Sequence, residues 1–128
     1  MMKIFTQIFF IGVLSAFALS ACGEEDPTDP TAKIIKERQS NFKKMGAAFK
    51  SIDDEFKSNA PDLEVIRTSV QTTHDLAKKL PDWFEPGTGP DSGFKTDSKP
   101  EIWSQPDKFD MVYNAFKGAV ENLFTAST

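Results

Sequence analysis

The sequence predicts an all-α fold, an antiparallel bundle of helices. Three stretches place apolar residues alternately three and four positions apart, which is the spacing of one face of an α-helix. No alternation of apolar and polar residues long enough for a strand occurs in the sequence. The short connection between the first two stretches favours helices that run up and down beside each other.

The first predicted helix spans about 31–58. Its apolar seam includes one charged residue, Arg38, and the positions around the seam are mostly charged, as a solvent-facing side requires. Pro61-Asp62 begins the next helix, because proline is tolerated in a first helical turn. The seam residues are Ile35, Arg38, Phe42, Met45, Phe49, Ile52 and Phe56.

The second predicted helix spans about 62–80 and stops at Pro81, and the third spans about 105–125, with an acidic residue in its first turn. Between them lies a long loop, 81–104, rich in glycine and proline but anchored by the aromatic residues Trp83, Phe84 and Trp103. The inward positions are Leu63, Ile66, Val70, Thr73, Ala77 and Leu80 in the second helix, and Phe109, Tyr113, Phe116, Val120 and Leu123 in the third.

Phenylalanine is abundant on these helices, and two interpretations remain open. One is a Phe-rich core, which needs no ligand. The other is a pocket for a flat apolar ligand, with Arg38 placed for that ligand's anionic edge. The rings concerned are Phe42, Phe49, Phe56, Phe109, Phe116 and Phe124.

The N-terminal residues predict export. A basic start and an apolar run too short for a confident membrane span indicate a signal peptide over 1–21. The run ends in Leu19-Ser20-Ala21-Cys22, which resembles the lipobox of bacterial lipoproteins, so we expect Cys22 to be lipidated; the alternative is an ordinary secretory signal. The protein would then be anchored in the membrane on the periplasmic side. The outer membrane is favoured because glycine, not aspartate, follows the cysteine.

Composition limits the remaining chain to one small domain. After an acidic, proline-broken tether (22–30), the helical domain covers 31–128. From Cys22 onward the chain has 107 residues with 14 basic and 19 acidic side chains, a net charge of −5, which argues against nucleic acid as a partner. Cys22 is the only cysteine, so neither an internal disulfide nor a cysteine-based metal cluster can form.

Three local motifs resemble the cytochrome c prime family, the class II c-type cytochromes, over about 34–123. They occur in the family's order along helix, loop and helix. The motifs are IKERQSNFKKMG at 35–46, LPDWF followed by PGTG at 80–89, and KTDSKPEIW at 95–103.

This resemblance implies a four-helix bundle that binds haem c. Arg38 and Gln39 match the family's pair near the haem propionates; the alternative for Arg38 is a surface residue whose aliphatic stem alone is buried. Phe42 matches the position facing the distal side of the iron, where a side chain that cannot ligate implies a five-coordinate site. Thr96 and Asp97 match the stretch of the long loop that approaches the haem edge, with Trp83 and Trp103 burying their indoles to hold that loop.

The chain departs from the family in lacking Cys-x-x-Cys-His, the motif that attaches haem and supplies the proximal iron ligand. Three helices of the bundle are present, and covalent attachment is not possible in the chain as written. The sole histidine, His74, is predicted to be a partly exposed surface residue of the second helix. We expect the chain to be truncated before the covalent site; the alternative is a naturally haem-free relative.

Two functions follow. The first is a haem-binding cytochrome of the cell envelope that transfers electrons or binds small gases. For this function the family resemblance implies a redox partner protein and a homodimer formed through the first two helices. The second is a haem-free helical lipoprotein with a structural or interaction role. An enzyme is the least favoured class, because the sequence holds no Ser/His/Asp constellation and no phosphate-binding glycine loop.

Overall fold

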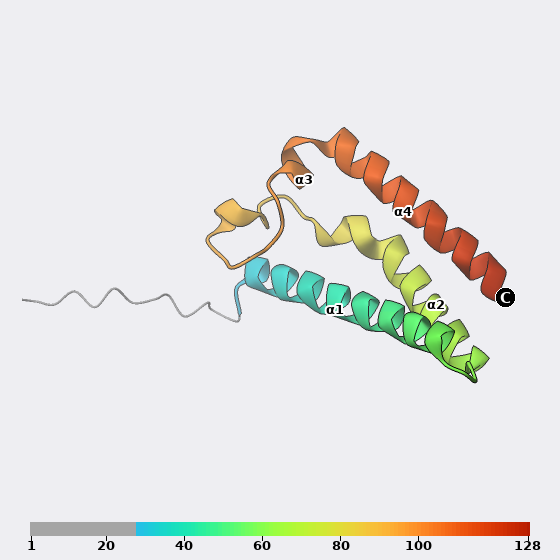
Figure 1. Ribbon diagram of the computed structural model, residues 1–128. Coiled ribbons are helices and arrows are strands. Elements are labelled where there is room, and N and C mark those ends of the chain that lie inside the picture. Colours follow the sequence, from blue (N-terminus) through green and yellow to red (C-terminus); the bar gives the residue numbers. More distant parts are fainter. Residues whose placement is uncertain (1–27) are drawn as a thin grey trace, which may run out of the picture.

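The computed structural model describes residues 28–128, which are helical and contain no strand (Figure 1). The predicted all-α class is therefore confirmed. The predicted signal peptide and Cys22 lie outside the described residues, as does most of the predicted tether. The elements are α1 (Pro30–Lys57), α2 (Leu63–Lys79), the 3-10 helices η1 (Leu80–Trp83) and η2 (Pro90–Ser92), and the helices α3 (Glu101–Ser104) and α4 (Pro106–Ser127).

Two aspartates set the starts of the first two long helices. The carboxylate of Asp29 accepts hydrogen bonds from two backbone N–H groups in the first turn of α1, and Asp62 does the same for α2. These contacts satisfy N–H groups that have no partner within the helix. The three long helices begin and end within two residues of the bounds expected from the sequence.

Helix α2 lies between α1 and α4 and packs against both, so that the three long helices run up, down and up (Figure 1). One part of the core lies at the end that carries the long loop, and the other lies toward the α1–α2 turn. The buried residues of the first part are Met45, Ala77, Leu80, Trp83 and Val120, and those of the second are Ile52, Ile66 and Val70.

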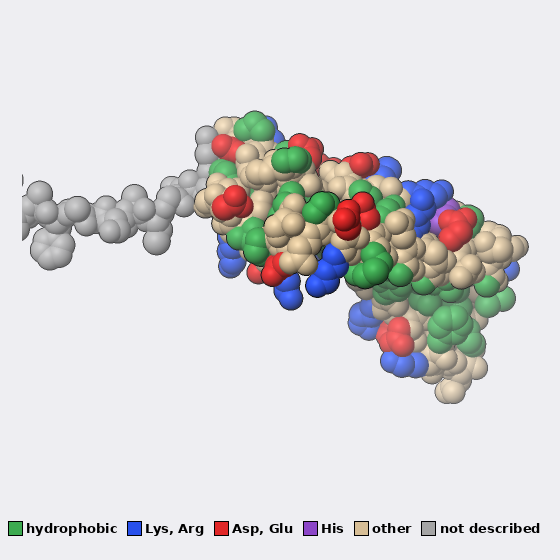
Figure 2. All heavy atoms as spheres, turned by 90° about the horizontal axis from the view of Figure 1, so that it is seen from above, with side chains coloured by type: hydrophobic (Ala, Val, Ile, Leu, Met, Phe, Trp, Pro, Cys, Tyr) green, Lys and Arg blue, Asp and Glu red, His purple; other side chains and the backbone are tan. Residues whose placement is uncertain are grey.

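The predicted seam of α1 divides into a buried and an exposed part. Ile35, Arg38, Met45 and Ile52 are buried, whereas Phe42, Phe49 and Phe56 are 44%, 38% and 67% exposed. The phenylalanines of the seam are thus only partly covered by the other helices. Helix α2 packs against the side of α1 that carries the buried residues. Of the phenylalanines, Phe49 contacts α4, where its ring lies 6.5 Å from that of Phe116 between centroids. On the face shown in Figure 2, hydrophobic side chains gather at the end of the molecule opposite the grey trace.

The glycine and proline content of the long loop predicts an irregular segment, but the loop contains three short helical turns. The two 3-10 helices and α3 occupy less than half of it. Gly87 and Gly93 take φ angles of 80° and 84°, a left-handed conformation that glycine adopts without strain. Trp83 is buried and Trp103 is partly buried. The anchors therefore hold short helical turns that cross one end of the bundle. None of the helices within 28–128 is long and apolar enough to cross a membrane.

Candidate functional site: a cavity between α1, the long loop and α4

A cavity of about 1050 Å³ lies between α1, the long loop and the first half of α4. Its lining combines aromatic and aliphatic side chains with a polar edge. The edge carries four cationic side chains and two acidic ones, an excess that favours an anionic group on a bound molecule. The lining residues are Arg38, Gln39, Phe42, Lys43, Phe84, Thr96, Asp97, Ser98, Lys99, Glu101, Ile102, Gln105, Lys108, Phe109 and Val112.

The structure brings all five residues singled out as cofactor-binding to this one cavity. Arg38, Gln39 and Phe42 reach it from α1, and Thr96 and Asp97 reach it from the loop. Positions 38 and 42 lie one helical turn apart and so face the same side of α1. Their roles toward haem stay predictions.

Sequence reasoning missed part of the apolar wall, Phe84, Ile102 and Val112. For Phe84 the sequence predicts only a role as a loop anchor. Neither it nor Ile102 belongs to a periodic pattern, because one follows η1 and the other lies in the four-residue helix α3. The wall is tightly connected: the Phe42 ring makes an edge contact with Trp83 at 5.2 Å between centroids, and Phe84 makes one with Phe109 at 5.3 Å.

Arg38 is 2% exposed and is held by the long loop. Its Nη1 donates to Trp83 O at 3.3 Å and to Thr88 Oγ1 at 2.9 Å. Its Nη2 donates to Thr88 O at 2.8 Å and to Thr96 Oγ1 at 2.9 Å. The alternative of a surface arginine with only its stem buried is therefore wrong.

The charge of Arg38 is buried without a carboxylate within ion-pair distance among residues 28–128. The Phe84 and Trp103 rings lie 5.2 Å and 5.8 Å from its central carbon, and aromatic faces attract a cation. Burial lowers the pKa of the guanidinium below its usual value, but an arginine stays protonated at physiological pH. The cavity edge thus carries a permanent positive charge.

Thr88 and Trp103 complete the fastening of the loop. The Thr88 hydroxyl donates to Glu85 O at 2.7 Å while it accepts from Arg38, and Trp103 Nε1 donates to Phe84 O at 3.0 Å and to Glu85 O at 3.1 Å. Thr88 is 2% exposed and does not line the cavity. Thr88 lies in the PGTG stretch of the second motif, but no role could be predicted for it, because a single threonine among glycines has no pattern around it.

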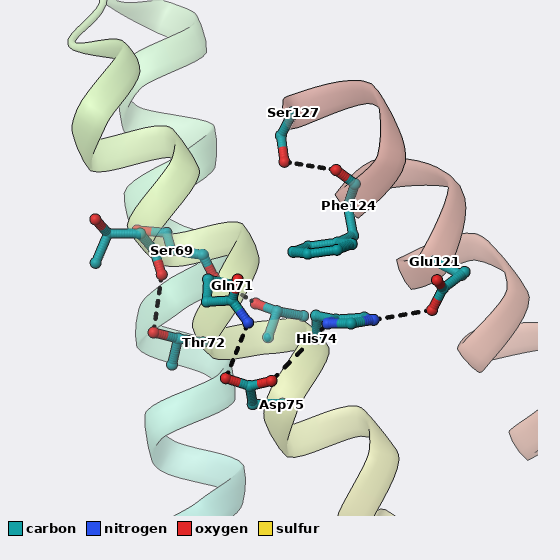
Figure 3. Close-up of polar contacts among 10 residues, drawn as sticks. Ser69, Gln71, Thr72, His74, Asp75, Glu121, Phe124 and Ser127 are labelled. Atoms are coloured by element: carbon teal, nitrogen blue, oxygen red, sulfur yellow. Dashed lines mark hydrogen bonds and ion pairs between the residues drawn. The ribbon is translucent and has the colours of Figure 1, made fainter.

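His74 lies outside the cavity and is buried, so the expectation of a partly exposed surface histidine is wrong. It is 5% exposed, and its Nε2 lies 2.9 Å from Glu121 Oε2 on α4 (Figure 3). Its position beside the seam of α2 faces α4, which covers it. Within residues 28–128, no three His, Cys, Asp or Glu side chains come together in a group that could hold a metal ion.

Comparison with known proteins gives one match. The family model described as Cytochrome C' matches residues 33–128, which is most of the chain. No curated protein and no solved structure matches significantly. The matched region contains every residue of the cavity, and the chain belongs to the cytochrome c′ family.

Proposed function

We propose that the cavity between α1, the long loop and α4 binds haem, and that the protein is a c-type cytochrome that transfers electrons or binds a small gas. The observation that carries this proposal is the shape and chemistry of the lining. A cavity of about 1050 Å³ with aromatic walls and a cationic edge suits a flat apolar ring system with carboxylates at one side. Membership of the cytochrome c′ family supports the choice of haem.

The residues fit the two parts of such a ligand separately. Phe42, Phe84 and Phe109 offer apolar contact to the macrocycle. Gln39 and Lys43 lie on the polar edge and can donate hydrogen bonds to propionates, while the fixed charge of Arg38 attracts them. Phe42, which lines the cavity, would restrict access to one face of a bound haem. Haem, when bound, supplies the iron that carries an electron or binds a gas.

The residues described here do not supply an axial iron ligand. The lining contains no histidine, cysteine or methionine among residues 28–128. Residues 28–128 would therefore hold haem through the walls and edge of the cavity alone, and the covalent bond of a c-type cytochrome would need a Cys-x-x-Cys-His motif. We further propose that a Cys-x-x-Cys-His segment is encoded beyond the Thr128 codon. Reading the DNA downstream of that codon tests this, and a stop followed by unrelated sequence would count against it.

Haem titration of the purified protein tests the function. We expect a Soret band that saturates with added haem and is removed by acid–acetone extraction, which leaves only covalent haem. Two neighbours on α4 give a matched pair of variants. Val112 lines the cavity and is 59% exposed, whereas Met111 does not line it and is 65% exposed.

Val112→Asp should weaken haem binding, because it places a carboxylate in the cavity lining, and Met111→Asp should leave haem binding unchanged. Both variants add the same charge at an exposed site, so a difference between them comes from the cavity. Equal effects of the two variants, or no saturable Soret band, would reject the cavity as a haem site. A band that resists acid–acetone would reject non-covalent binding.

The location and partners are part of the proposal. Family members are typically periplasmic, and a lipid on Cys22 would tether the domain to the membrane there. With an acidic net charge of −4 for the whole chain, a protein redox partner suits the surface better than nucleic acid.

A second candidate function is a haem-free interaction protein, favoured by the exposed phenylalanines of α1. Exposed apolar patches on soluble domains commonly mark contact sites. The haem titration separates the two functions, because an interaction protein would bind no haem yet still associate through this surface.

A further inference from the structure

The terminal nitrogens of Arg38 are fully used by the protein itself. Each of the two carries two N–H groups, and together they make four hydrogen bonds to Trp83, Thr88 and Thr96. A ligand carboxylate could make a two-point contact with these nitrogens only by displacing acceptors of the loop. Arg38 is therefore built to hold protein rather than to grip a ligand.

The acceptors mark three separate points along the loop, and two of them adjoin the cavity wall. Trp83 directly precedes Phe84, whose ring lies 5.2 Å from the guanidinium carbon and lines the cavity. Thr96 itself lines the cavity. The position of both wall segments thus depends on the same guanidinium.

We propose that Arg38 is a positioning residue of the proposed haem site: it fastens the long loop at Trp83, Thr88 and Thr96, and acts on the ligand through the wall that this loop forms. The proposal rests on the proposed function for its ligand, but the fastening itself concerns the protein alone. We name this arrangement of Arg38 with its three loop residues the loop clasp.

A variant of Thr88 can distinguish a positioning role of Arg38 from direct contact between Arg38 and the ligand. Thr88 accepts from both terminal nitrogens of Arg38, is 2% exposed, and is absent from the cavity lining. Thr88→Val keeps the shape of the side chain but removes the hydroxyl, so one N–H of Arg38 loses its partner in a buried place. A change in haem affinity in this variant cannot come from a lost contact of Thr88 with the ligand, and reflects a shift of the loop or of Arg38.

The experiment measures two properties of the full chain and its variants. The first is how strongly a quencher added to the solution reduces tryptophan fluorescence in the absence of ligand. This quenching reports how well the loop is fastened, because both tryptophans, Trp83 and Trp103, belong to the fastened region. The second is the haem affinity. Thr88→Val should increase quenching about two-fold or more and leave the far-UV circular dichroism unchanged. It should weaken haem binding about five- to ten-fold, which is roughly the effect of one lost hydrogen bond.

Three further variants make the result specific. Thr88→Ser keeps the hydroxyl and should restore both properties. Arg38→Lys keeps the charge but cannot make four fork-like bonds, and should weaken binding at least as much as Thr88→Val. Thr73→Val makes the same chemical change at a buried threonine of α2, whose hydroxyl bonds Ser69 O at 3.0 Å, and should change neither property.

The outcomes distinguish the two proposals. Unchanged quenching and affinity in Thr88→Val, with affinity retained in Arg38→Lys, would overturn the positioning role and leave haem binding in place. If the unaltered protein binds no haem, the proposed function fails. In that case the quenching of Thr88→Val against Thr88→Ser still decides the loop clasp. If Thr88→Val does not fold, Thr96→Val, which removes a different acceptor of Arg38, takes its place in the quenching comparison.

Discussion

The imidazole of His74 lies parallel to the ring of Phe124, with 3.9 Å between centroids and 4° between planes. His74 belongs to α2 and Phe124 to α4, and the same imidazole reaches Glu121 one helical turn earlier (Figure 3). Val120 is the only buried residue of α4. The stacked pair with its hydrogen bond is therefore a main attachment of α4 to α2.

Removing the imidazole should loosen α4. We predict that His74→Ala lowers the free energy of unfolding by about 1–3 kcal/mol, since it removes a buried ring contact and leaves a gap between two helices. Urea unfolding followed by far-UV circular dichroism measures this. The matched variant Glu121→Gln keeps an acceptor for Nε2 on a half-exposed side chain and should cost less than about 1 kcal/mol. A larger loss in Glu121→Gln than in His74→Ala would place the attachment in the charge instead of the ring.

A glycine under Trp103 should resist substitution. A Cβ added at Gly89 would lie 3.0 Å from Trp103 Cζ3 and 3.0 Å from Asp91 Oδ1. The indole cannot easily move away because its Nε1 donates two hydrogen bonds. We predict that Gly89→Ala costs about 1–3 kcal/mol of stability and shifts the tryptophan emission.

The control for this prediction is Gly46 in the middle of α1, where an added Cβ would meet nothing within 4 Å. Gly46→Ala should stabilise the protein by about 0.5–1 kcal/mol, because alanine loses less conformational entropy in a helix. Equal and small effects at the two positions would show that the indole yields to the methyl group.

The exposed stripe of α1 should make the protein self-associate. Phe42, Phe49 and Phe56 recur every seven residues and so lie along one line of the helix. We predict that the protein without ligand binds a hydrophobic dye and forms dimers, as measured by light scattering. Phe56→Ser, at the most exposed of the three, should reduce both without lowering stability, and the exposed Lys44→Ser of the same helix should not. A dye-free monomer would contradict this prediction.

Cys22 should carry a lipid. We predict that Cys22→Ser abolishes the mass increase of the processed protein and moves it from the membrane to the soluble fraction, because the acyl chains are attached to the thiol and to the new N-terminus. Mass spectrometry and detergent partitioning test this. Identical masses and identical partitioning would favour an ordinary secretory signal.

The sequence was sufficient for features that depend on nearby residues. Proline positions and the three-and-four spacing gave the class and the approximate ends of the long helices. It also allowed the prediction that Arg38 and Phe42 share a face, one turn apart on α1. Residues 96 and 97 were placed beside them only through the family's motif, since no local rule connects positions so far apart.

Features that depend on which helix covers which face could not be predicted in the same way. Phe49 lies on the apolar seam of α1 and His74 lies beside that of α2, yet α2 leaves the first partly exposed and α4 buries the second. The partner of Arg38 was equally hidden. The sequence shows only that an arginine lies on an apolar seam. It does not reveal whether a ligand neutralises the guanidinium or a loop hydroxyl such as that of Thr88 accepts its hydrogen bonds.

The loop clasp also orders events in folding. It joins Arg38 to residues 45, 50 and 58 positions away, whereas α1 and α2 are connected by a short turn. Closing a long segment costs more chain entropy than closing a short one, and distant contacts form slowly. We expect the paired helices to form first and the loop to be fastened afterwards. In stopped-flow refolding the far-UV signal should then recover before tryptophan fluorescence, and a single shared time constant would show that helices and loop form together.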